Sequence, residues 1–168
     1  VRSRRQRQMC IRDSYYTWRF AKENLIGIVM TNSAPLMAPY GGKKREIGTN
    51  PISIGIPARN EKPIILDMAS SVAAYGKIQI AAMENKKIPL DWARNIEGME
   101  TDNPNEALKG TLQPLAKHKG YGLAVIVDCL TSLLSCGEFG DKITGIDGLN
   151  EKTNENISHF MLCLLYTS

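Results

Sequence analysis

The feature that most constrains the fold of this 168-residue chain is the apolar segment from Gly120 to Leu134. Its sequence, GYGLAVIVDCLTSLL, is apolar on almost every side of a helix, and such a helix is buried rather than laid on a surface. The chain is long enough for one domain with a core that could enclose it. The segment is shorter than the roughly 18 to 20 apolar residues of a membrane helix. We therefore expect a core helix and no membrane partner.

Short apolar segments with β-branched residues precede this helix and are predicted to be strands. They are Leu25 to Thr31, Ile52 to Ile56 between two prolines, and Ile64 to Asp67 after Pro63. A further strand is expected at Ile157 to Met161, ending where the natural sequence ends.

Helical patterns alternate with these strands, which predicts an α/β protein. The helices are expected at Tyr16 to Asn24, at Ser70 to Lys86 and in a short segment that Asn103 would cap. Asn32 to Gly42 and Gly137 to Asn156 are rich in turn-forming residues and are expected to be loops.

Both ends of the chain resemble translated sequencing adapter. Met9 to Ser14 (MCIRDS) and Cys163 to Ser168 (CLLYTS) match translations of the two strands of one transposon-library adapter, and Ser3 to Gln8 match the bases commonly placed before it. Engineered segments are excluded from fold reasoning. We therefore expect 1–14 and 163–168 to be adapter-derived and not natural.

The charge balance depends on these ends. The chain has 21 basic and 17 acidic side chains, a net charge of +4. The first fourteen residues contribute five arginines and one aspartate and the last six contribute no charge, which leaves sixteen of each sign in 15–162. A neutral body argues against a nucleic-acid partner. The alternative is a non-catalytic α/β ligand-binding module whose arginine-rich arm binds nucleic acid.

The residues that usually carry metal or acid–base chemistry are isolated. Cys129 and Cys136 lack CxxC spacing and have no histidine at metal-ligand distance, so they are expected to be small buried side chains, and no metal site is predicted. His118 and His159 have no partner acid in the sequence pattern, so no catalytic residue is predicted. A reducing, cytoplasmic location is expected by default.

Two positions suit a bound ligand. Asp67 ends a predicted strand just before a predicted helix, where it would either cap the helix or accept hydrogen bonds from ribose hydroxyls; composition alone favours the cap. Lys119 stands beside Gly120 and Gly122, small residues that would let a phosphate or nicotinamide approach the backbone, or that serve helix packing. The chain has no GxGxxG motif.

Four segments together resemble the malate/L-lactate dehydrogenase family, in order and in spacing. They are Gly27 to Pro57, Ile64 to Ala82, Ile88 to Ala93 and His118 to Leu130. The family includes ureidoglycolate dehydrogenase, diketogulonate reductase and sulfolactate dehydrogenase. The resemblance implies an α/β fold that binds NAD or NADP without a standard Rossmann fingerprint, hydride transfer between the cofactor and a 2-hydroxyacid or 2-oxoacid, and a homodimer. On this basis 15–162 is a partial NAD(P)-binding α/β domain.

The resemblance also implies which residues contact the cofactor: Ser33, Asp67, Met68, Ala69, His118 and Lys119. It favours the ligand role of Asp67 over the cap. The family's catalytic histidine and substrate-binding arginine would lie upstream of Tyr15, so we expect this chain to be an inactive fragment of an enzyme. We also expect Ser33, Asp67 and Lys119 to line one concavity.

Overall fold

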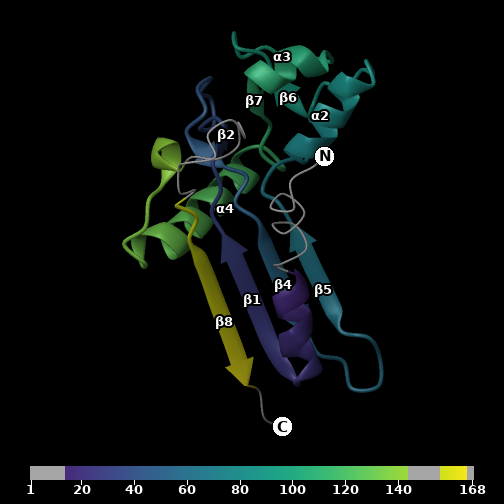
Figure 1. Ribbon diagram of the computed structural model, residues 1–168, viewed down its shortest axis with the longest axis vertical. Helices are drawn as coiled ribbons and strands as arrows, with labels where there is room; N and C mark the ends of the chain where they lie inside the picture. The colour runs from purple at the N-terminus through teal and green to yellow at the C-terminus, as the bar shows by residue number, and fades with distance from the viewer. Residues whose placement is uncertain (1–13, 144–155, 166–168) are drawn as a thin grey trace.

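The computed structural model describes residues 14–143 and 156–165, which form two four-stranded sheets with helices around them (Figure 1). The larger sheet has the order β5-β4-β1-β8, and the smaller has the order β3-β2-β7-β6. The expected α/β class is confirmed, and the larger sheet is antiparallel throughout. Within the described residues, no helix is long and apolar enough to cross a membrane.

The larger sheet consists of β1 (Leu25–Thr31), β4 (Ile52–Ile56), β5 (Ile64–Met68) and β8 (His159–Leu165). The smaller sheet consists of β2 (Pro35–Met37), β3 (Ile47–Gly48), β6 (Ala93–Arg94) and β7 (Thr111–Leu112). The helices are an N-terminal helix over 14–22, α2 (Tyr75–Met83), α3 (Pro104–Lys109) and α4 (His118–Asp128). A π-helical turn (Cys129–Leu133) continues α4, and a 3-10 turn follows (Gly140–Lys142).

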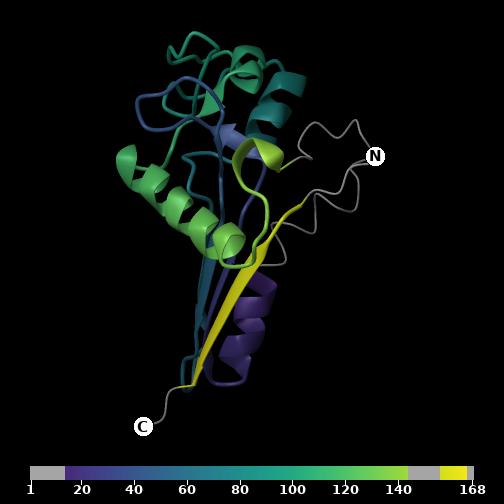
Figure 2. The same ribbon diagram turned by 90° about the vertical axis from the view of Figure 1, so that its left-hand side faces the viewer.

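The N-terminal helix packs on one face of the larger sheet because glycines make room for it. Gly27 and Gly55 are directly paired across β1 and β4. A Cβ at Gly27 would overlap the Phe20 ring, and a Cβ at Gly55 would overlap the Thr17 backbone. Glycine in a strand commonly marks such a close approach. The helix and α4 lie on opposite sides of the sheet (Figure 2).

The main core lies between the smaller sheet and its helices, in the upper part of Figure 1. It gathers apolar side chains from β2, β3, α2, β7 and α4, so these elements are fixed to one another by burial of apolar surface. Its buried members are Leu36, Met37, Ile47, Ile78, Ile88, Ala93, Ala107, Leu112 and Ala124.

The predicted cap of α3 is confirmed. The Oδ1 of Asn103 accepts a hydrogen bond from the backbone N–H of Asn105 at 2.9 Å, and Pro104 occupies the first helical position. Both features satisfy the needs of a helix N-terminus locally. At the other end, the Arg45 guanidinium donates to two carbonyl oxygens, Nε to Gly110 at 2.6 Å and Nη2 to Leu108 at 2.6 Å.

The predicted start of the helix after β5 is wrong. That helix, α2, begins at Tyr75 and not at Ser70. The backbone N–H of Ser70 donates to the Thr49 carbonyl at 2.8 Å, and that of Val72 donates to the Gln113 carbonyl at 2.9 Å. These long-range bonds hold the segment extended. Asp67 therefore lies inside β5, not at a helix N-terminus, and its interpretation as a helix cap is wrong.

The predicted loop of Asn32 to Gly42 contains the short strand β2, which pairs with β3 and β7. The last strand also differs from expectation, since β8 continues past Met161 to Leu165, opposite Leu25. Backbone pairing along β1 requires no particular side chain. The adapter origin of 1–14 and 163–168 therefore stays a prediction, and residues 1–13 and 166–168 lie outside the described part.

The prediction that the Gly120–Leu134 helix is buried on all sides is wrong for the described structure. Ile126 is 55% exposed and Leu133 is 58% exposed, because only one face of the helix meets the body. The buried face consists of Gly120, Ala124 and Val127 in α4, followed by Thr131 and Ser132 in the π-helical turn. The expectation of buried thiols is also wrong for Cys136, which is exposed, whereas Cys129 is partly buried.

Candidate functional site

The turn after β1 and the segment after β5 meet at Thr49, which precedes β4. The Thr49 carbonyl accepts hydrogen bonds from the backbone N–H and the Oγ of Ser70, both at 2.8 Å. The Oγ of Ser33 lies 3.5 Å from the Oγ1 of Thr49. Because neighbouring strands are antiparallel, the last residues of β1 and β5 and the first residues of β4 lie at the same end of the sheet. Ser33 and Ala69 are thereby brought into one region.

The first turn of α4 joins the same region. The backbone N–H of Leu115 donates to the Ser70 carbonyl at 2.8 Å, and the N–H of Gly120 donates to the Leu115 carbonyl at 2.7 Å. A Cβ at Gly120 would lie 2.6 Å from the Ser70 carbonyl oxygen, so only glycine permits this approach. His118 and Lys119, both exposed, therefore stand next to the segment that follows Met68 and Ala69.

The backbone that leads into α4 is strained. Ala116 and Lys117 have φ values of 48° and 60°, in the left-handed region that non-glycine residues rarely occupy. This turn sets the position at which α4 begins. The ring of His118 then packs edge-on against Tyr40, with 5.8 Å between ring centroids. Strained backbone of this kind persists where surrounding packing enforces it.

Asp67 is directed away from α4. In an antiparallel sheet, directly paired residues point to the same face, and Asp67 is paired with Ser53. The Oγ of Ser53 lies 2.7 Å from the Oγ1 of Thr17 in the N-terminal helix, which covers the face opposite α4 (Figure 2). The Asp67 carboxylate thus lies across the sheet from Lys119. This geometry does not support the expected single concavity lined by Ser33, Asp67 and Lys119.

Behind Ser33 lies a buried polar cluster that sequence reasoning missed. Asn32 and Asn50 are both fully buried. The Oδ1 of Asn50 accepts the Ser33 backbone N–H at 3.0 Å, and its Nδ2 donates to the Ala124 carbonyl of α4 at 2.9 Å. The Asn50-Pro51 pair signals a turn, but it carries no information about partners 17 and 74 positions away.

Asp128 belongs to this cluster and was also missed. It is the single charged residue of the apolar Gly120–Leu134 segment. Burial raises the pKa of its carboxyl above the ordinary value, and side-chain hydrogen bonds from Ser132 and the two asparagines offset part of that rise. A lone acid in an apolar helix is the signal that could have identified it, because acids are seldom buried unless they are hydrogen-bonded.

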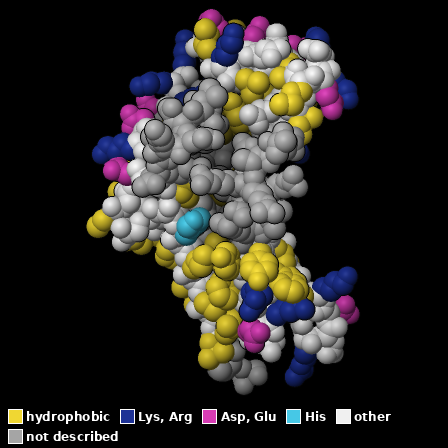
Figure 3. Space-filling view, in the orientation of Figure 1, with side chains coloured by type: hydrophobic (Ala, Val, Ile, Leu, Met, Phe, Trp, Pro, Cys, Tyr) yellow, Lys and Arg dark blue, Asp and Glu magenta, His cyan; other side chains and the backbone are white. Residues whose placement is uncertain are grey.

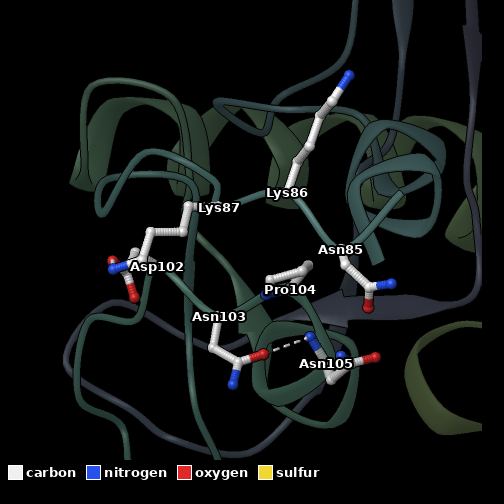
Figure 4. A pocket seen from close by; sticks show the side chains of 7 residues that line it. All are labelled: Asn85, Lys86, Lys87, Asp102, Asn103, Pro104 and Asn105. Carbon is white, nitrogen blue, oxygen red and sulfur yellow. Dashed lines mark hydrogen bonds and ion pairs between the residues drawn. The ribbon is translucent and has the colours of Figure 1, made fainter. Parts of the chain in front are cut away.

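A pocket of about 420 Å³ lies elsewhere, between the end of α2 and the start of α3 (Figure 4). It contains none of the six predicted cofactor residues. Lys87 on its wall forms an ion pair with Asp102, with 2.6 Å between Nζ and Oδ2, and Asn103 is used as the α3 cap. Its polar groups therefore serve local structure. In the described ranges, no three His, Cys, Asp or Glu side chains gather into a metal-binding group.

Comparison with known families points to one kind of protein. The family model for malate/L-lactate dehydrogenases matches residues 3–167, a range that reaches into both segments predicted to be adapter-derived. A malate dehydrogenase of Pyrococcus abyssi is 41% identical over 89% of this chain and 42% of its own length. A malate/(S)-sulfolactate dehydrogenase of Methanothermus fervidus is 44% identical over 78% of this chain and 38% of its own length.

A solved structure agrees with these sequence relatives. A dehydrogenase from Sinorhizobium meliloti superposes with a TM-score of 0.83 and 36% identity, covering 90% of this chain and 44% of that protein. The chain thus spans less than half the length of the relatives that it matches.

Proposed function

This chain belongs to the malate/L-lactate dehydrogenase family, and from that premise we propose that it supplies part of the NAD- or NADP-binding site of an oxidoreductase. The whole enzyme would transfer a hydride between the nicotinamide and a 2-hydroxyacid or 2-oxoacid, such as malate, lactate, sulfolactate or ureidoglycolate. The observation that carries the proposal is the meeting of the Ser33 turn, the Ala69–Ser70 segment and the start of α4 around Thr49.

In this proposal the charged contact to the cofactor comes from a side chain. The backbone N–H groups of residues 119–121 already donate to carbonyl oxygens of residues 115–117. They are therefore not free to bind a phosphate, and the exposed ammonium of Lys119 is the group that does so. His118 lies beside it, and the Ser33 hydroxyl and the backbone of Met68 and Ala69 complete the contacts. Asp67 remains a sixth predicted contact, and the sheet register makes it the least supported.

The substrate-binding and acid–base groups of the whole enzyme would lie outside this chain. Its length is less than half that of its matched relatives, and the resemblance assigns the catalytic histidine to a region preceding Tyr15. We propose that the chain is a fragment that has no turnover alone, and that the complete enzyme is a cytoplasmic homodimer.

The test is nucleotide binding by the 168-residue chain, followed through NADH and NADPH fluorescence. Lys119→Ala should raise the dissociation constant of the preferred nucleotide about tenfold, the value of one charge-assisted contact. Lys62→Ala, in the exposed connection between β4 and β5, is the matched control and should change nothing. Asp67→Ala should have a smaller effect than Lys119→Ala.

Two results would contradict the proposal. If neither NADH nor NADPH binds, the chain's own residues do not form a cofactor site. Nucleotide-dependent oxidation of malate, lactate or sulfolactate by the chain, read as absorbance of the reduced cofactor at its characteristic wavelength, would show that a complete catalytic set is present.

A further inference from the structure

The polar cluster below the Ser33 turn has a negative charge at its centre. Asp128 ends α4, and its Oδ1 accepts a hydrogen bond from the Ser132 Oγ at 3.2 Å. The same Ser132 oxygen accepts a hydrogen bond from the Asn32 Nδ2 at 2.6 Å. A hydroxyl that accepts from an amide and donates to a carboxylate has a fixed orientation. The side chain of Asn32 is thereby connected to Asp128.

A second connection runs through Asn50. Its side-chain amide faces the Asp128 carboxyl and lowers the pKa of that group, and it donates to the Ala124 carbonyl at 2.9 Å. Its Oδ1 accepts the backbone N–H of Ser33 at 3.0 Å. The two neighbours in the turn, Asn32 and Ser33, are thus both held by groups that contact one carboxylate. Asn32 also accepts the backbone N–H of Ser158 through its Oδ1, at 2.7 Å.

We propose that Asp128 is a positioning residue, which fixes the Asn32–Ser33 turn and so sets the affinity of the site for its dinucleotide. The proposal rests on the proposed function, because Ser33 is taken to contact the cofactor. Asp128 itself acts through Asn32, Asn50 and Ser132.

A carboxylate suits this position better than an amide. It offers only acceptors, and the groups that face it are amide and hydroxyl donors. An asparagine at this position would direct its own NH₂ group toward another donor or lose one of the contacts. Hydrogen bonds to a charged acceptor are also stronger than those between neutral groups. The Asp128→Asn variant therefore separates the role of charge from that of size.

The first experiment measures amide hydrogen exchange in the full 168-residue chain. In Asp128→Ala and Asp128→Asn, exchange of the Ser33 N–H should accelerate about tenfold or more relative to the buried core amide of Ile78. The Ile78 amide reports the global stability of the same molecule, so local loosening of the turn is recognised when Ser33 accelerates by a larger factor than Ile78 does. Asp141→Ala, at an exposed acid of the 3-10 turn, is the matched control and should leave the ratio unchanged. An unchanged ratio in both Asp128 variants would overturn the proposal.

Ser132→Ala keeps the carboxylate and removes one connection, so it serves if the Asp128 variants do not fold. It should accelerate Ser33 exchange relative to Ile78, and an unchanged ratio would overturn the connection from Asp128 through Ser132 to the turn. The second experiment repeats the NADH and NADPH titrations, where Asp128→Asn should raise the dissociation constant about tenfold.

The two proposals can fail separately. If the unsubstituted chain binds no nucleotide, the proposed function fails, while the exchange ratio still decides whether Asp128 positions the turn. If the chain binds nucleotide and the Asp128 variants loosen Ser33 without any change in affinity, the claimed effect of this residue on cofactor binding is overturned.

Discussion

At the scale of single residues, the Asp128 carboxyl makes stability depend on pH. Its pKa is raised in the folded chain by burial, relative to an ordinary value of 3.8. The protonated carboxyl therefore adds to the free energy of unfolding. This contribution is fully present below the unfolded-state pKa and is lost as the pH rises through the folded-state pKa. The ionised carboxyl is thus retained at a cost to folding.

We therefore predict that Asp128→Asn flattens this part of the pH profile. The free energy of unfolding of the variant should not show the loss that the unsubstituted chain shows as the pH rises from below 3.8 through the raised pKa. Urea denaturation at several pH values measures both profiles. Parallel profiles for the two proteins would mean that Asp128 is not desolvated in the folded state. Above the raised pKa the variant should bind nucleotide less well, because it lacks the charged acceptor that faces Ser132 and Asn50.

Sequence reasoning succeeded at residues whose partners are close in the chain. The Asn103 cap was predictable because its acceptor serves an N–H two residues later. The partners of Asn50 lie 17 and 74 positions away, and no local pattern encodes them. The cap interpretation of Asp67 failed for the same reason, since distant hydrogen bonds at Ser70 delay the following helix.

At the scale of elements, the junction between α4 and the strand ends depends on one glycine. We predict that Gly120→Ala destabilises the chain by about 1–3 kcal/mol, the usual cost of overpacking. Its Cβ would collide with backbone oxygens of Leu115 and Ser70, which cannot move as a side chain can. Chemical denaturation monitored by circular dichroism would measure the loss.

Gly122→Ala is the matched control for this prediction. It lies two residues further along α4, and a Cβ there has nothing within 4 Å. Alanine favours a helix over glycine by about 1 kcal/mol, so this variant should be unchanged or more stable. Equal losses at both positions would mean that the close contact with Ser70 is absent in solution.

Elements were predictable where the local pattern agrees with the final pairing. The bounds of β1 and β4 follow from short apolar runs between turn residues, and both coincide with expectation. The two-residue strands β3, β6 and β7 could not be predicted, because only their partners distinguish them from loop. The exposure of Ile126 was likewise hidden, since composition alone does not show how many sides of a helix are covered.

At the scale of the whole molecule, the larger sheet leaves apolar side chains exposed. The register places Ile56, Ile64, Leu66, Leu162 and Leu164 on the face away from the N-terminal helix, and all five are exposed. On the side shown in Figure 3, hydrophobic side chains also gather over β8 and the N-terminal helix. Contiguous apolar surface of this kind promotes association.

We predict that the isolated chain self-associates through this sheet face. Leu66→Lys and Leu164→Lys, each at a position that is 45% exposed, should shift sedimentation profiles toward the monomer by adding repelling charges. Asn60→Lys, at an exposed position in the connection before β5, adds the same single positive charge and controls for the change of net charge. If the control disperses the chain as well as the leucine variants do, net charge and not apolar contact governs association.

The pairing of β1 with β8 has a consequence for the order of folding. β1 spans residues 25–31, and its second neighbour in the sheet comes from residues 159–165. The hairpin of β4 and β5 and its contact with β1 need only nearby segments, so they can form early. The contact with β8 requires closure of a loop of more than a hundred residues, which is entropically costly and slow. Until that closure, β1 is an unprotected edge strand. The slowest folding phase of the chain should therefore be the one most sensitive to chain concentration, because another molecule can occupy that edge first.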